Sequence, residues 1–137
     1  MKVLIDTNII LDFFLAREPH ASTAKQIFAM MYKNEISAFT TASSITDVYY
    51  ITAKRIGNSA ARNAIAQLLK ILGVIAVDGN DCAAALNLPM DDFEDAVIVS
   101  CASKEGINYI ISNDKDFLDI SQNLASVISP EDFFLTI

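Results

Sequence analysis

The chain has 137 residues, of which 53% are hydrophobic, and its formal net charge is −7. A chain of this length buries about two-thirds of its unfolded surface, so we expect one domain spanning residues 1–137. An acidic protein is a poor general binder of phosphate groups. The charge therefore disfavours a simple nucleic-acid-binding module more than a metal-dependent nuclease, in which bound divalent ions offset part of the negative charge.

The composition also argues against membrane, disulfide and zinc-binding proteins. The longest apolar stretch, residues 64–77, is interrupted by Gln67, Lys70 and Gly73 and is too short to cross a bilayer. The first two residues lead directly into a strand-like run, so we expect no signal peptide and a soluble, cytoplasmic protein. One histidine and two cysteines are too few for a zinc site or a disulfide framework.

Short apolar runs alternate with helical patterns along the chain. The predicted strands cover residues 2–5, 36–41, 74–77, 109–111 and 126–128. The predicted helices cover about 9–16, 20–34, 43–56, 58–72, 79–88 and 91–105, with a terminal helix starting near 130. This alternation predicts an α/β fold with a mainly parallel sheet and helices on both of its faces.

Acidic side chains follow two of these predicted strands. Asp6 comes directly after the first strand, and Asn113, Asp114 and Asp116 come after the fourth. Because the carboxyl ends of parallel strands share one edge of a sheet, we expect these groups to lie near one another. Asp95 begins the helix that leads into the fourth strand and should lie near the same edge.

Asp95 occupies an unusual place for a carboxylate. On a helical wheel it shares the apolar face of Ile98, Val99 and Ala102. An ionised carboxylate on such a face needs a partner, a proton or a metal ion, because its desolvation is costly. The other interpretation is that Asp95 and the two aspartates before it cap the helix, and the helix alone leaves both open.

Asp47 lies in the predicted helix 43–56. The apolar stripe of this helix contains Ile45, Val48 and Tyr49, and Asp47 lies on the opposite face beside Tyr50. Periodicity alone therefore predicts a solvated carboxylate at position 47.

Clustered carboxylates without histidine are the ligands that Mg²⁺ and Mn²⁺ prefer. Ions held there activate water and stabilise the oxygens of an in-line phosphodiester displacement. Without a cation, such carboxylates repel one another and raise one another's pKa values. Asp6 with Asp95 is the pair that favours this chemistry, since a lone aspartate after a strand is a common helix cap.

Four short motifs occur in one order along nearly the whole chain. They are residues 4–8 (LIDTN), 43–51 (SSITDVYYI), 92–96 (DFEDA) and 111–117 (ISNDKDF). Together they resemble the PIN-domain family, and most of all the VapC-like toxin ribonucleases of toxin–antitoxin pairs.

The resemblance implies a three-layer α/β/α sandwich and a metal-dependent endoribonuclease that uses Mg²⁺ or Mn²⁺. It also implies a cognate antitoxin, an RNA substrate and a homodimer. The catalytic and metal-binding acids that it implies are Asp6, Asp47, Asp95 and Asp116, supported by Asn8, Ser44 and Asn113. Asp47 stands where the family usually has glutamate, and its shorter side chain reaches less far, so a water is expected to bridge it to the metal.

Other enzymes with an aspartate after a strand fit less well. A haloacid-dehalogenase-like phosphatase needs a second aspartate two residues after the first, where this chain has Asn8, and a response-regulator receiver needs an early acidic pair. The remaining alternative is a PIN-like scaffold without catalysis that binds other proteins. Asp47 in place of glutamate favours that alternative, and intact Asp6, Asp95 and Asp116 argue against it.

Overall fold

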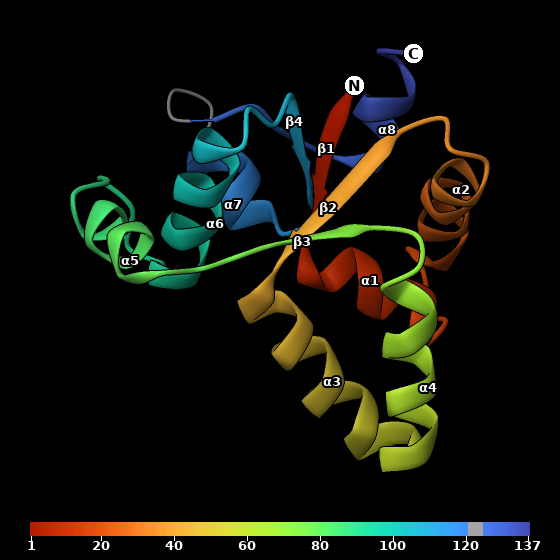
Figure 1. Cartoon of the computed structure of the whole chain (residues 1–137). Helices are drawn as coiled ribbons and strands as arrows, with labels where there is room; N and C mark the ends of the chain where they lie inside the picture. The colour runs from red at the N-terminus through yellow and green to blue at the C-terminus, as the bar shows by residue number, and fades with distance from the viewer. Residues whose placement is uncertain (121–124) are drawn as a thin grey trace.

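The computed structural model describes residues 1–120 and 125–137 and contains one five-stranded sheet (Figure 1). The strands are β1 (Lys2–Ile5), β2 (Ser37–Thr41), β3 (Gly73–Ile75), β4 (Tyr109–Ile111) and β5 (Val127–Ile128). Their order is β3-β2-β1-β4-β5, and every neighbouring pair is parallel. The predicted α/β fold with a parallel sheet is confirmed, and β1 lies at its centre.

Helices cover both faces of this sheet (Figure 1). On one side lie α5 (Gly79–Leu86), α6 (Phe93–Lys104) and α7 (Lys115–Ile120). On the other side lie α1 (Thr7–Phe14), α2 (Ala21–Tyr32) and α8 (Pro130–Phe134). The helices α3 (Ala42–Ile56) and α4 (Asn58–Leu68) pack together and extend away from the sheet, beyond the edge where β1 and β2 end. In the part of the chain that the structure describes, no helix is long and apolar enough to cross a membrane.

The central strands are buried on both faces, which explains why β1 and β4 consist almost wholly of apolar residues. In β1, Val3 and Ile5 pack against α1 and α2, while Leu4 packs on the opposite side with the residues of α6. In β4, Ile111 packs on the side of α1 and α2, and Ile110 packs on the side of α6. The alternation fixes the register of these strands, because a slip of one residue would exchange the two faces.

Several details differ from the sequence prediction. The expected strand 74–77 is the shorter β3, and α7 already begins at Lys115, so Asp116 lies in a helix and not in a loop. The buried face of α3 contains Ser44, Val48 and Thr52. Because Ser44 and Thr52 are small hydroxyl residues, the apolar periodicity of the sequence does not reveal this face. The prediction that the chain is one domain over residues 1–137 stays a prediction.

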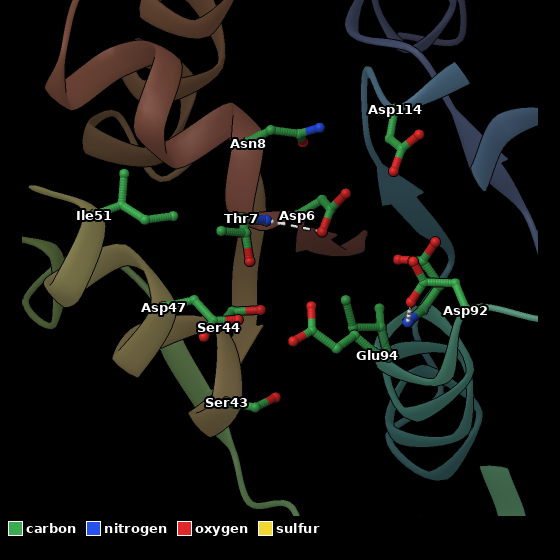
Figure 2. Close-up of a pocket in the computed structure, with 12 residues that line it drawn as sticks. Asp6, Thr7, Asn8, Ser43, Ser44, Asp47, Ile51, Asp92, Glu94 and Asp114 are labelled. Carbon is green, nitrogen blue, oxygen red and sulfur yellow. Dashed lines mark hydrogen bonds between the residues drawn. The ribbon is translucent and has the colours of Figure 1, made fainter. Parts of the chain in front are cut away.

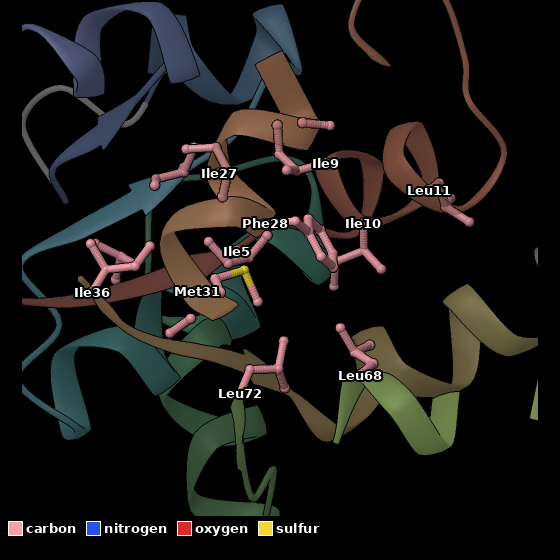
Figure 3. Packing of buried hydrophobic residues seen from close by; sticks show 14 of the residues in the cluster. Ile5, Ile9, Ile10, Leu11, Ile27, Phe28, Met31, Ile36, Leu68 and Leu72 are labelled. Carbon is pink, nitrogen blue, oxygen red and sulfur yellow. The ribbon is translucent and has the colours of Figure 1, made fainter. Parts of the chain in front are cut away.

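Phe28 of α2 is the centre of the larger core cluster (Figure 3). Its side chain is 1% exposed and stacks on Phe13 with ring centroids 3.9 Å apart. We expect Phe28→Ala to lower the free energy of unfolding by about 3–5 kcal/mol, because a large cavity would remain. Tyr32→Ala on the same helix is the control: its side chain is 57% exposed, so the change should stay within about 0.5 kcal/mol. Urea denaturation of both variants measures the difference, and equal losses would contradict this description of the core.

Candidate active site

A pocket of about 400 Å³ lies at the carboxyl edge of the sheet, between α1, α3 and α6 (Figure 2). It is lined by Asp6, Thr7, Asn8, Ser43, Ser44, Asp47, Ile51, Asp92, Glu94, Asp95, Ile98 and Asp114. Six of these residues are acidic and none is basic. The topology therefore gathers carboxylates from four separate segments of the chain in one place, and we call this the acidic pocket.

Asp6 is the most buried of these acids, with 6% of the residue exposed. It ends β1 and is the N-cap of α1, where it accepts a hydrogen bond from the backbone N–H of Thr7 at 2.8 Å. Its second oxygen accepts a hydrogen bond from the Ser112 hydroxyl at 2.7 Å. Burial raises the pKa of Asp6 in spite of these two hydrogen bonds, which act in the opposite direction. Asp6 is thus both the N-cap of α1 and a lining residue of the acidic pocket.

At the start of α6 two aspartates line the acidic pocket, and one of them is also the helix cap. Asp92 is the N-cap and accepts a hydrogen bond from the backbone N–H of Asp95 at 3.0 Å. The side chain of Asp95 is therefore not needed as the cap, and it lines the acidic pocket. Burial, with the negative charges of Asp92, Asp6 and Asp114 adding to it, raises the pKa of Asp95 to about 7.

Asp47 and Glu94 approach from opposite walls of the acidic pocket. Asp47 is half-buried on α3, and Glu94 lies in the first turn of α6 with its carboxylate turned toward the α3 wall (Figure 2). The pKa of Glu94 is raised, chiefly by the negative charge of Asp47. Periodicity had predicted a solvated Asp47, whereas the structure places its side chain half-buried in the lining of the acidic pocket. Glu94 was not predicted as a site residue.

The fourth predicted acid, Asp116, does not line the acidic pocket. It is exposed in the first turn of α7 and borders a smaller neighbouring pocket with Asp92, Asp95 and Asp114. The acidic pocket contains Asp114 instead, which directly precedes α7 and accepts a hydrogen bond from the backbone N–H of Asp116 at 3.0 Å. The sequence signal for Asp114 was its position, since it is the first carboxylate after β4.

The predicted supporting residues are placed differently from one another. Asn8 and Ser44 line the acidic pocket, but in the described residues the partner of the Ser44 hydroxyl is Thr41, and the buried Asn8 Oδ1 has none. The amide of Asn113 donates a hydrogen bond to Asp12, and Asn113 does not line the acidic pocket. The residue that hydrogen-bonds to the Asp6 carboxylate is Ser112, which sequence reasoning missed because a serine after a strand has no distinctive pattern.

These side chains fit a hard divalent cation by their chemistry. All six ionisable groups of the acidic pocket are carboxylates, and their mutual repulsion contributes to the raised pKa of Asp95. Within residues 1–120 and 125–137, no three acidic, histidine or cysteine side chains lie close enough together to hold an ion in their present positions. A bound cation would thus have to draw the carboxylates inward. This movement would break no ion pair, because no basic residue lines the acidic pocket.

Comparison with known proteins agrees with this fold. A family model described as the PIN domain matches residues 2–116. The chain is 31% identical over 121 residues to a protein named Ribonuclease VapC1 of Aquifex aeolicus, which covers 85% of this chain and 83% of the relative. This chain belongs to the PIN-domain family.

Solved structures show the same fold at lower identity. The chain is similar to VapC20 of Mycobacterium tuberculosis, described as a Sarcin-Ricin loop cleaving toxin, with a TM-score of 0.69, 21% identity and coverage of 85% of this chain and 93% of that one. It is also similar to a chain of a toxin–antitoxin complex from Klebsiella pneumoniae, with a TM-score of 0.68, 20% identity and coverage of 93% and 97%. Another similar chain belongs to VapBC2 of Rickettsia felis bound to promoter DNA, with a TM-score of 0.69, 14% identity and coverage of 94% and 98%.

The raised pKa of Asp95 predicts a pH-dependent stability in metal-free buffer. The pKa of the Asp95 carboxyl is about 7 in the folded protein, against a usual value of 3.8. The folded state therefore holds this proton more tightly than the unfolded state does. Its contribution to stability is complete below about pH 4 and is lost as the pH rises through about 7. We expect the melting temperature of the wild type to fall more between pH 5 and pH 8 than that of Asp95→Asn, as measured by thermal denaturation in EDTA. Parallel curves for the two proteins would contradict the raised pKa.

Proposed function

We propose that this chain is a metal-dependent endoribonuclease, acts in the cytoplasm, and is the toxin of a toxin–antitoxin pair. The observation that carries the proposal is the acidic pocket at the carboxyl edge of the sheet of a PIN domain, lined by six acids and no base. The relative of 31% identity that is named a ribonuclease supports the activity.

In this proposal Asp6, Asp47 and Asp95 hold Mg²⁺ or Mn²⁺, as the family resemblance implies, and Asp114 takes the place predicted for Asp116. When bound, the ion supplies an activated water and stabilises the negative charge that develops on the phosphodiester. Without it, six carboxylates would repel the phosphates of RNA, so substrate and ion must bind together.

The residues of the chain hold the carboxylates in place for this reaction. Thr7 and Ser112 each donate a hydrogen bond to Asp6, which fixes both oxygens of that carboxylate. The Asp92 carboxylate accepts a hydrogen bond from the backbone N–H of Asp95, which fixes the start of α6. Glu94 faces the α3 wall and adds a longer carboxylate from the side opposite the short Asp47, which offsets the reach lost by the replacement of the usual glutamate.

Two of the similar solved structures belong to toxin–antitoxin complexes, and they support an antitoxin as the partner of this chain. We propose a homodimer as well. Large apolar side chains exposed on α3 are compatible with such contacts: Tyr50 is 66% exposed, Ile51 42% and Ile56 47%.

The activity is tested on total cellular RNA, because a selective nuclease can ignore a model substrate. The antitoxin-free protein is incubated with RNA and Mg²⁺ or Mn²⁺, and new RNA ends are mapped. We expect discrete new ends that require the metal and disappear with Asp95→Asn. Glu105→Gln, which changes an exposed acid at the other end of α6, is the matched control and should cut like the wild type.

A PIN-like scaffold without catalysis is the second candidate function, and two observations favour it. The side chain of Asp47 is short, and among the described residues no three carboxylates lie close enough together to hold an ion. If no new ends form and no metal raises the melting temperature, the nuclease proposal is wrong and the scaffold explains the fold better. Under that alternative, Asp95→Ala should be neutral or stabilising, because it removes a carboxylate that nothing neutralises.

The same assay distinguishes the two candidates for the fourth acid. Asp114→Asn should reduce the cleavage rate by more than about 100-fold, because it removes a proposed metal ligand and not merely an outer partner. Asp116→Asn should retain most of the activity, since this side chain is exposed outside the acidic pocket. The opposite ranking would restore the assignment to Asp116.

A further inference from the structure

Another pocket, distinct from the one that Asp116 borders, adjoins the acidic pocket. It contains charged side chains that the proposed reaction does not use. It is lined by Asn8, Asp12, Arg17, Glu18, Pro19, His20 and Asn113, and Asn8 lines both pockets. Its most buried acid is Asp12 of α1, which is 3% exposed and does not line the acidic pocket. A carboxylate buried this deeply requires an explanation, because its desolvation is costly.

The two oxygens of Asp12 have different partners. Oδ1 accepts a hydrogen bond from Arg17 Nε at 2.9 Å within an ion pair. Oδ2 accepts a hydrogen bond from Asn113 Nδ2 at 2.6 Å. The first contact stays within a short stretch of the chain, whereas the second joins α1 to the segment that follows β4. Asp12 thus connects the element after Asp6 with the element that carries Asp114.

The Asn113 amide is held in one orientation by this contact. Its Oδ1 is buried and has no hydrogen-bond partner among the described residues. Turning the amide over would place that oxygen against the carboxylate of Asp12, which is unfavourable. The direction of the Asn113 side chain is therefore set by Asp12.

Asp114 follows directly, so two consecutive anchors precede it. The Ser112 hydroxyl donates to Asp6 and accepts from the backbone N–H of Asp114 at 3.0 Å. Asn113 is tied to Asp12 in the way just described. Both contacts limit rotation of the backbone immediately before Asp114, whose carboxylate lines the acidic pocket (Figure 2).

We propose that Asp12 and Asn113 are positioning residues, whose hydrogen bond sets the direction of the Asp114 carboxylate for binding a divalent cation. The inference rests on the proposed function, because it takes the acidic pocket as the metal site. Arg17 has a different role: it neutralises Asp12 from the other side and donates a hydrogen bond to the backbone carbonyl of Asn8 at 3.3 Å.

Two variants separate positioning from simple stability. Asn113→Ala removes the contact to Asp114's segment and leaves Asp12 paired with Arg17. Arg17→Gln is the matched control, because it removes the other contact of the same carboxylate, together with the hydrogen bond from Arg17 to the Asn8 carbonyl, and leaves Asn113 bound. Both should lower the melting temperature in EDTA. We expect only Asn113→Ala to weaken Mn²⁺ binding, by about tenfold or more, as measured by isothermal titration calorimetry.

The outcomes separate this inference from the proposed function. If the wild type binds neither Mn²⁺ nor Mg²⁺, the metal site is wrong and the positioning role falls with it. If the wild type binds Mn²⁺ and both variants bind it equally well, or lose affinity equally, the positioning role alone is overturned. Asn113→Leu, which has a similar volume and no donor, repeats the test at lower temperature if the alanine variant is unfolded without metal.

Discussion

The carboxylate of Asp6 is 6% exposed at the end of the central strand, and the rest of the site depends on how that burial is tolerated. Its two oxygens are satisfied by the first N–H of α1 and by the hydroxyl of Ser112 at the end of the neighbouring strand. The strand order places β4 directly beside β1, so the second donor is available only in this topology. One buried acid therefore joins the helix that follows β1 to the segment that follows β4.

Electrostatics explain why this arrangement favours a metal-binding role over a structural one. The ion pair between Asp12 and Arg17 shows that the chain neutralises a buried acid where neutrality is needed. A few residues away, the acidic pocket holds six acids without a basic side chain, and the pKa of Asp95 rises to about 7. Such repulsion lowers stability unless a cation offsets it, and a site of this kind is more easily understood as functional.

Much of the fold could be predicted from the sequence, because each central strand is a short apolar run that is buried on both faces. The sequence could predict that Asp6 and Asp95 lie near one another, since one follows a strand and the other begins a helix that leads into the neighbouring strand. Asp47 could not be placed by periodicity, because Ser44 and Thr52 form part of the buried face of α3 and do not look apolar. The choice between Asp114 and Asp116 depended on where α7 begins, and the contact of Asn113 with Asp12 depended on packing between segments about a hundred residues apart.

In the proposed site Asp6, Asp95 and Asp114 hold a divalent cation together, and Asp47 reaches the same ion from the α3 wall. Anomalous diffraction from crystals grown with Mn²⁺ tests this most directly, because it locates the ion independently of any activity. The account predicts an anomalous peak in the acidic pocket within coordination distance of these three carboxylates, with Asp47 or Glu94 approaching from the opposite walls. A fully occupied ion bound elsewhere, or a pocket that stays without a peak at saturating Mn²⁺, would contradict it.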